Sequence, residues 1–162
     1  MRAVAVLVAS LVVALAAAGP AASIDRPLTI RLVSNLVSLR EIDAAPKGRA
    51  GPGDGLSTVS RLRNGVVQFG RKKNAVVGTD RARLTLQQDG SLRISGTATL
   101  PGGTIRFDGR VSAGQPKTVV IQVVGGTGRY ENVRGTVAVT DLDDRGTALN
   151  VYRLVPGGAN VA

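Results

Sequence analysis

Residues 123–135 read VVGGTGRYENVRG, and this stretch decides which fold the chain can adopt. A run of strand-forming residues, 117–124, leads into it, and a second such run, 136–140, follows it. Glycine tolerates a positive φ angle and lets two backbone segments approach closely, which side chains would forbid. The stretch therefore predicts a tight corner between two strands, held by Tyr130 and by the planar donor group of Arg134.

Apolar and polar residues alternate along most of the chain after residue 27. This period of two is typical of a strand with one buried and one solvated face. The apolar positions of the runs are Leu28, Ile30 and Leu32; Ala82, Leu84 and Leu86; Leu92 and Ile94; Ile105 and Phe107; Val137 and Val139; and Leu149 and Val151. Turn signals such as Asp89-Gly90 and Asp144-Arg145-Gly146 separate these runs at hairpin spacing.

Many short strands with closely spaced turns predict an all-β fold, either an antiparallel barrel or a sandwich. We favour the barrel because closure removes the sheet edges that invite aggregation. A barrel of about eight strands also leaves an interior that side chains or one small ligand can fill. We find no internal repeat, and residues 24–155 are expected to form one domain with a loose tail at 156–162.

The first 23 residues are typical of a secretory signal peptide. Met1-Arg2 is followed by an apolar run, 3–18, that only Ser10 interrupts, and then by small residues. A retained membrane anchor is the alternative, but the run is shorter than the roughly 20 residues that a bilayer span needs. We therefore expect a secreted protein that contacts a membrane only through this segment during export.

The 162-residue chain contains neither cysteine nor histidine. This excludes disulfides, the usual structural zinc sites and catalytic triads built on histidine. Acid–base chemistry is left to Asp, Glu, Tyr or Lys. Glu41, Asp43 and Asp54 flank the irregular stretch 43–55 and are our candidate catalytic residues, since an acid beside the apolar walls of a barrel mouth has a raised pKa. Ordinary solvated loop carboxylates are the alternative.

The formal net charge of +10 suggests an anionic partner. Specific nucleic-acid binding is disfavoured because the chain has only four aromatic residues on which bases could stack. The basic residues gather on consecutive expected strands, where they predict an outward-facing stripe. They are Arg61, Arg63, Arg71, Lys72, Lys73, Arg81 and Arg83.

The glycine motif resembles the signature of the barrel family shared by plant allene oxide cyclases, dirigent proteins and their bacterial relatives. The residues that carry the resemblance are Gly125, Gly126, Thr127, Gly128, Tyr130, Arg134 and Gly135. The closing run GTALNVYRL, 146–154, is similar to the end of dirigent proteins. The motif lacks the Lys and Ser or Thr of a phosphate-binding loop, so we interpret it as structural.

The resemblance implies an eight-stranded antiparallel, calycin-like barrel with a lipophilic cavity, often assembled as a homotrimer. It also implies an activity on a small hydrophobic molecule, such as the cyclisation of an oxylipin or the coupling of a phenolic, with no metal or organic cofactor. The alternative hypothesis is a non-catalytic exported protein whose basic surface contacts anionic envelope polymers or a protein partner.

Overall fold

The computed structural model describes residues 23–44, 46, 48–112 and 117–157. The predicted signal peptide lies outside these residues except for its last position, and so does the tail from 158 onward. Within the described ranges, no helix is long and apolar enough to cross a membrane.

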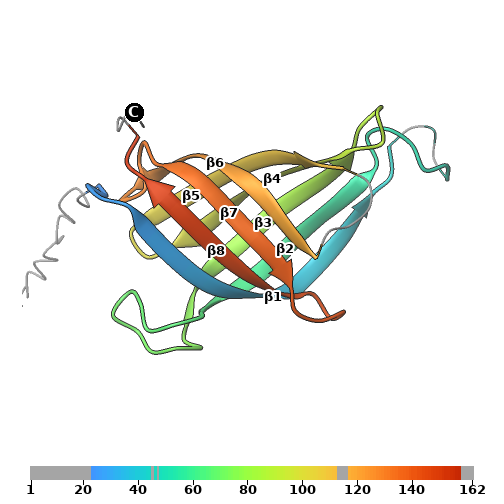
Figure 1. Ribbon diagram of the computed structural model, residues 1–162. Coiled ribbons are helices and arrows are strands. Elements are labelled where there is room, and N and C mark those ends of the chain that lie inside the picture. The colour runs from blue at the N-terminus through green and yellow to red at the C-terminus, as the bar shows by residue number, and fades with distance from the viewer. Residues whose placement is uncertain (1–22, 45, 47, 113–116, 158–162) are drawn as a thin grey trace, which may run out of the picture.

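Eight antiparallel strands, each paired with the next, close into a barrel when β8 pairs with β1 (Figure 1). The strands are β1 (Leu28–Ile42), β2 (Gly55–Asn64), β3 (Val76–Leu86), β4 (Leu92–Leu100), β5 (Gly103–Val111), β6 (Thr118–Gly128), β7 (Arg134–Asp141) and β8 (Thr147–Val155). This confirms the expected all-β, eight-stranded antiparallel barrel.

The two ends of the barrel differ (Figure 1). At one end, which we call the closed end, lie the β2–β3, β4–β5 and β6–β7 connections together with the start of β1 and the end of β8. Tyr130, Val133 and Ile24 are buried there and fill the barrel. The β1–β2, β3–β4, β5–β6 and β7–β8 connections surround the other end, which we call the mouth.

Inward-facing side chains of the strands form the core, and most of the alternating runs face inward as predicted. The prediction was wrong for β8, where Ala148, Asn150, Tyr152 and Leu154 are the buried positions and Leu149 and Val151 lie on the opposite face. The core is densest toward the closed end, where Leu100, Ile105, Val123, Val137 and Leu154 come from five different strands and are almost fully buried. Because apolar side chains occupy this half of the interior, any internal cavity must lie between them and the mouth.

The glycine cluster belongs to the end of β6, and the corner expected there lies just after it, at residues 129–133. The pairing of β5 with β6 shifts register beside Gly125, whose φ is +146°. A Cβ atom on Gly126 would overlap the backbone oxygens of Thr104 and Tyr130. Glycines are therefore needed here so that β6 can bulge and lie close to both neighbouring segments.

Removing the surface ion pair between Arg93 and Asp108 is expected to change stability little. The Arg93 Nη2 to Asp108 Oδ2 distance is 2.6 Å, but the side chains are 55% and 33% exposed. Exposed pairs of this kind contribute about 0–1 kcal/mol. Arg93→Ala should therefore leave the urea denaturation midpoint nearly unchanged, and 1 M salt should abolish any difference. A larger, salt-independent loss would contradict this.

Candidate functional site

An internal cavity of about 330 Å³ lies in the half of the barrel nearer the mouth. Its walls are mainly apolar, with a few polar side chains toward the middle of the barrel. The lining residues include Leu84 and Leu92 near the mouth, Ala82, Ile94, Phe107, Val119, Ile121 and Val139 along the walls, and Ser34, Ser60, Asp80 and Asn150 deeper inside. This volume is at the lower end of the roughly 300–1,000 Å³ of small-molecule sites.

Asp80 is the chemically distinctive residue of this cavity. It lies on the inward face of β3, directly opposite Ser60 of β2 and Ala98 of β4. Its Oδ1 atom is buried and has no hydrogen-bond partner in the protein. Burial raises the pKa of Asp80 to about 7, against a smaller lowering by the backbone N–H of Arg81. A carboxyl group with such a pKa both donates and accepts a proton at neutral pH.

Two residues of β8 extend the polar part of the interior. Tyr152 is completely enclosed, and burial raises the pKa of its phenol well above the usual value, with the nearby Asp80 carboxylate adding to the effect. Tyr152 therefore stays a neutral phenol across the physiological range. Asn150 is also buried, and its Oδ1 atom has no partner in the protein. Asp80 and Asn150 thus both line the cavity, and each has a buried Oδ1 atom without a hydrogen-bond partner in the protein.

Two of the four hydroxyl groups that line the cavity are engaged with the barrel itself. Ser34 donates to the carbonyl of Ala148 at 3.3 Å, and Thr58 donates to the carbonyl of Ala82 at 3.5 Å. Among the described lining residues, the charged side chains are Asp80 and Asp141, with no Lys or Arg. The interior therefore favours a neutral molecule that carries a hydrogen-bond donor, and disfavours an anion.

The candidate acids Glu41, Asp43 and Asp54 lie at the mouth, around a separate surface pocket of about 420 Å³. The structure brings these three together, but it places none of them on the wall of the internal cavity. The Asp54 carboxylate accepts backbone N–H groups of Ala44 and Gly51, each at 2.7 Å. Asp54 therefore has a structural role, because these bonds hold Ala44 and Gly51 of the β1–β2 connection against its carboxylate.

The residues of the glycine motif lie at the closed end, away from the cavity. The Tyr130 hydroxyl donates to the carbonyl of Pro101 at 3.1 Å, and Arg134 Nη1 donates to the carbonyl of Val124 at 2.7 Å. The Tyr130 bond joins the β6–β7 connection to the β4–β5 connection, and the Arg134 bond joins the start of β7 to β6. In this position the motif lies at the closed end, and none of its residues lines the cavity.

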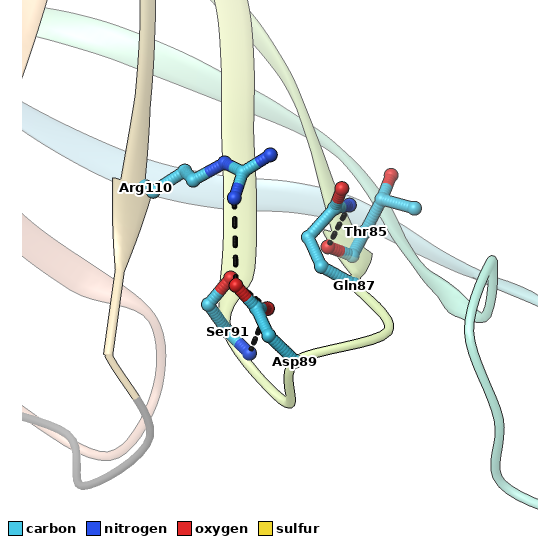
Figure 2. A network of polar contacts seen from close by, with 5 residues as sticks. All are labelled: Thr85, Gln87, Asp89, Ser91 and Arg110. Atoms are coloured by element: carbon cyan, nitrogen blue, oxygen red, sulfur yellow. Dashed lines mark hydrogen bonds and ion pairs between the residues drawn. The ribbon is translucent and has the colours of Figure 1, made fainter.

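A network of polar contacts orders the β3–β4 turn at the mouth (Figure 2). The Asp89 carboxylate accepts the backbone N–H of Ser91 at 3.0 Å and the Ser91 hydroxyl at 2.6 Å, and it pairs with Arg110 of β5 at 3.4 Å. The Ser91 hydroxyl, together with these other contacts, holds the pKa of Asp89 below its usual value. This side of the entrance is therefore held in one shape.

The candidate acids predicted from the sequence flank the stretch 43–55, but the sequence also contains a signal for Asp80. Asp80 precedes Ala82, Leu84 and Leu86 at a spacing of two, so it shares their face of β3. A charged residue in register with an apolar face is the pattern of a buried, functional carboxylate. Within the described part of the chain, no group of three or more potential metal ligands occurs.

No protein-family model matches the sequence, and no curated protein sequence matches it either. Several solved structures are similar. Pyocyanin demethylase aligns with a TM-score of 0.62 at 19% identity, over 79% of this chain and 100% of its own. The pterocarpan synthase dirigent protein GePTS1 aligns with a TM-score of 0.58 at 19% identity, over 80% and 83% of the two chains.

The exo-specific intermolecular Diels-Alderase AbnU is also similar, with a TM-score of 0.59 at 14% identity, over 79% of this chain and 97% of its own. At these identities the likeness concerns the fold, which agrees with the resemblance found in the glycine motif. The chain has the eight-stranded barrel fold that dirigent proteins share with these enzymes.

Proposed function

We propose that the barrel binds one small lipophilic molecule in its internal cavity and guides its cyclisation or coupling, with Asp80 as the proton-exchanging group. The observation that carries the proposal is the Asp80 carboxyl itself, whose Oδ1 atom is buried without a partner inside a largely apolar cavity. A buried acid without a partner reduces stability, so its presence in a cavity points to a chemical role.

The cavity favours a phenolic-like ligand over an oxylipin-like one. An oxylipin carboxylate inside the barrel would lie near Asp80 and Asp141, with no cationic lining residue to offset the repulsion. A neutral hydroxyl group would instead donate to the unpaired oxygen of Asp80 or Asn150. An anionic end could be accommodated only at the mouth, in contact with water.

The reaction class is a cofactor-free isomerisation or cyclisation. Asp80, with a pKa of about 7, removes a proton from a ligand hydroxyl in its ionised form and gives one to a developing oxyanion in its neutral form. The apolar walls hold the reacting groups in one orientation and exclude water, which lowers the entropic barrier. This role belongs to the proposal, as do secretion and assembly as a homotrimer.

Filling the cavity should abolish ligand binding without unfolding the barrel. Ala82→Phe places a large side chain next to Asp80 on the cavity wall. We expect the affinity for N-phenyl-1-naphthylamine, a neutral apolar dye with one N–H donor, to fall at least tenfold in a fluorescence titration. Native mass spectrometry after incubation with a phenolic and lipid extract should likewise show one retained small molecule in the wild type and none in the variant.

The matched control is Thr79→Phe, which adds the same ring to an exposed position of the same strand. It should bind the dye as the wild type does. If Ala82→Phe binds the dye equally well, the internal cavity is not the binding site. The remaining candidate function would then be the contact of the basic exterior with an anionic partner.

A further inference from the structure

The β2–β3 connection, residues 65–75, forms a basic loop that projects from the closed end of the barrel (Figure 1). Arg71, Lys72 and Lys73 are consecutive and exposed in it. Neighbouring cations come from β1 and β2, at Arg31, Arg61 and Arg63. No Asp or Glu occurs anywhere between residues 55 and 79. The loop is therefore a locally uncompensated cluster of positive charge.

The basic loop has a defined shape. The buried side chain of Asn64 donates through Nδ2 to the carbonyls of Gln68 at 2.9 Å, Arg71 at 3.1 Å and Lys72 at 3.3 Å. The Gln68 amide in turn donates to the carbonyl of Arg31 at 2.7 Å, which fixes the loop to β1. Phe69 packs against the core. Because the loop is already ordered, little conformational entropy is lost when it binds a partner.

Two valines accompany the charges. Val66 is 42% exposed and Val67 is 77% exposed. Both lie in the loop that Gln68 and Asn64 hold against the barrel. Exposed valines contribute nothing to binding a fully hydrated polyanion such as an acidic polysaccharide. Basic side chains next to exposed apolar ones are instead the combination that binds the interface of an anionic bilayer.

The charge of the whole closed end agrees with such a surface. Its cationic side chains come from the segment before β1, from every strand of the barrel except β3, β4 and β6, and from two connections. They are Arg26, Arg31, Arg61, Arg63, Arg71, Lys72, Lys73, Arg106, Arg129, Arg134 and Arg153. Among the described residues of this end, the acids are only Asp25 and Glu131. An anionic surface would therefore attract this end of the molecule and orient it.

We infer that the basic loop docks the barrel on the surface of an anionic lipid bilayer. Val66 and Val67 enter the headgroup region, while Arg71, Lys72 and Lys73 lie against the lipid phosphates. In this orientation the mouth points away from the bilayer, toward the aqueous phase. The inference is independent of the ligand cavity, and it departs from the expectation that membrane contact is limited to the N-terminal segment.

Co-sedimentation with vesicles tests this, using the full chain with the same N-terminus in every variant. Because every variant carries the same apolar N-terminal run, wild type should bind vesicles that contain phosphatidylglycerol much more tightly than pure phosphatidylcholine vesicles. Arg71→Gln/Lys72→Gln/Lys73→Gln should weaken the binding on the order of a hundredfold, at about fivefold for each charge. The control Arg49→Gln/Lys117→Gln/Arg145→Gln removes three exposed charges near the mouth and should bind nearly as the wild type does.

Val66→Ser/Val67→Ser distinguishes lipid from other polyanions. It should weaken vesicle binding roughly tenfold, since it removes the apolar contact, and leave binding to heparin and to a single-stranded oligonucleotide unchanged. An unaltered β-sheet circular dichroism spectrum and urea denaturation midpoint would show that each variant is folded. The inference is overturned if the two charge variants bind vesicles equally, if the valine variant binds them like the wild type, or if all proteins prefer the soluble polyanions.

Discussion

Asp80→Asn is expected to make the protein more stable at pH 8, by up to about 4 kcal/mol, and to leave its stability at pH 4 nearly unchanged. The reason is that the folded protein holds the Asp80 proton up to a pKa of about 7, whereas the unfolded chain loses it near 3.8. Between these values ionisation favours the unfolded state, at about 1.4 kcal/mol per pH unit. With Asp80 neutral, the wild type has its full free energy of unfolding below pH 4. This part of the stability is lost as the pH rises through 7.

Urea denaturation between pH 4 and pH 8 measures this as the difference between variant and wild type. The difference isolates Asp80, because acids whose pKa is lowered, such as Asp108 beside Arg93, contribute equally to both proteins and with the opposite sign. Asp43→Asn at an exposed position should follow the wild-type curve. A constant difference across the pH range would mean that Asp80 has the same pKa in the folded and the unfolded protein, which would contradict the prediction.

Asp80→Asn should also prevent proton transfer to and from a bound ligand, and it should leave ligand binding in the cavity intact. Positioned acids and bases contribute about 10²- to 10⁴-fold to a rate, so product formation from a ligand that native mass spectrometry identifies should fall by that factor. The amide still offers an oxygen acceptor to a ligand hydroxyl, and the dye should bind normally. If turnover is undiminished, a residue other than Asp80 transfers the proton. The mouth acids Glu41, Asp43 and Asp54 would then be the next residues to replace.

The fold could be predicted because two local signals agreed along the chain. Apolar positions alternated in runs that correspond to the strands, and turn residues such as Asp89-Gly90 separated them at the length of hairpins. The position of the glycine corner was less predictable. Gly125–Gly128 carry the composition of a turn, yet they form a strand end, because the decisive property is close packing against Thr104 and Tyr130.

The internal site was harder to predict because it exists only after closure. Asp80 and Asn150 lie on different strands, more than 60 residues apart, and neither residue type indicates by itself that it will be buried. Loop carboxylates such as Asp54 are readily predicted to be functional, since loops carry many functional residues. Here its oxygens accept backbone N–H groups of the same connection. The spacing along β3 already places Asp80 on the apolar face, but only the barrel geometry shows that this face borders a cavity.

Tyr130→Ala should cost about 3–5 kcal/mol of stability, which is the range for removing a fully buried aromatic ring. The ring is completely enclosed and fills the closed end, and a barrel without it would retain a void there. Tyr130→Phe keeps the ring and loses only the hydrogen bond to the carbonyl of Pro101, so it should cost about 1 kcal/mol. Chemical denaturation of the two variants against wild type measures both values.

The comparison of the two Tyr130 variants tests what the glycine motif is for. If the motif shapes β6 so that the Tyr130 ring closes the barrel, most of the cost belongs to the ring, and Phe restores it. If the hydroxyl is the essential group, both variants lose similar amounts. Arg129→Ala, at the exposed neighbouring position, should change stability by less than about 0.5 kcal/mol. Because the closed end supports the interior beneath Asp80, Tyr130→Ala should also weaken dye binding, and Tyr130→Phe should not.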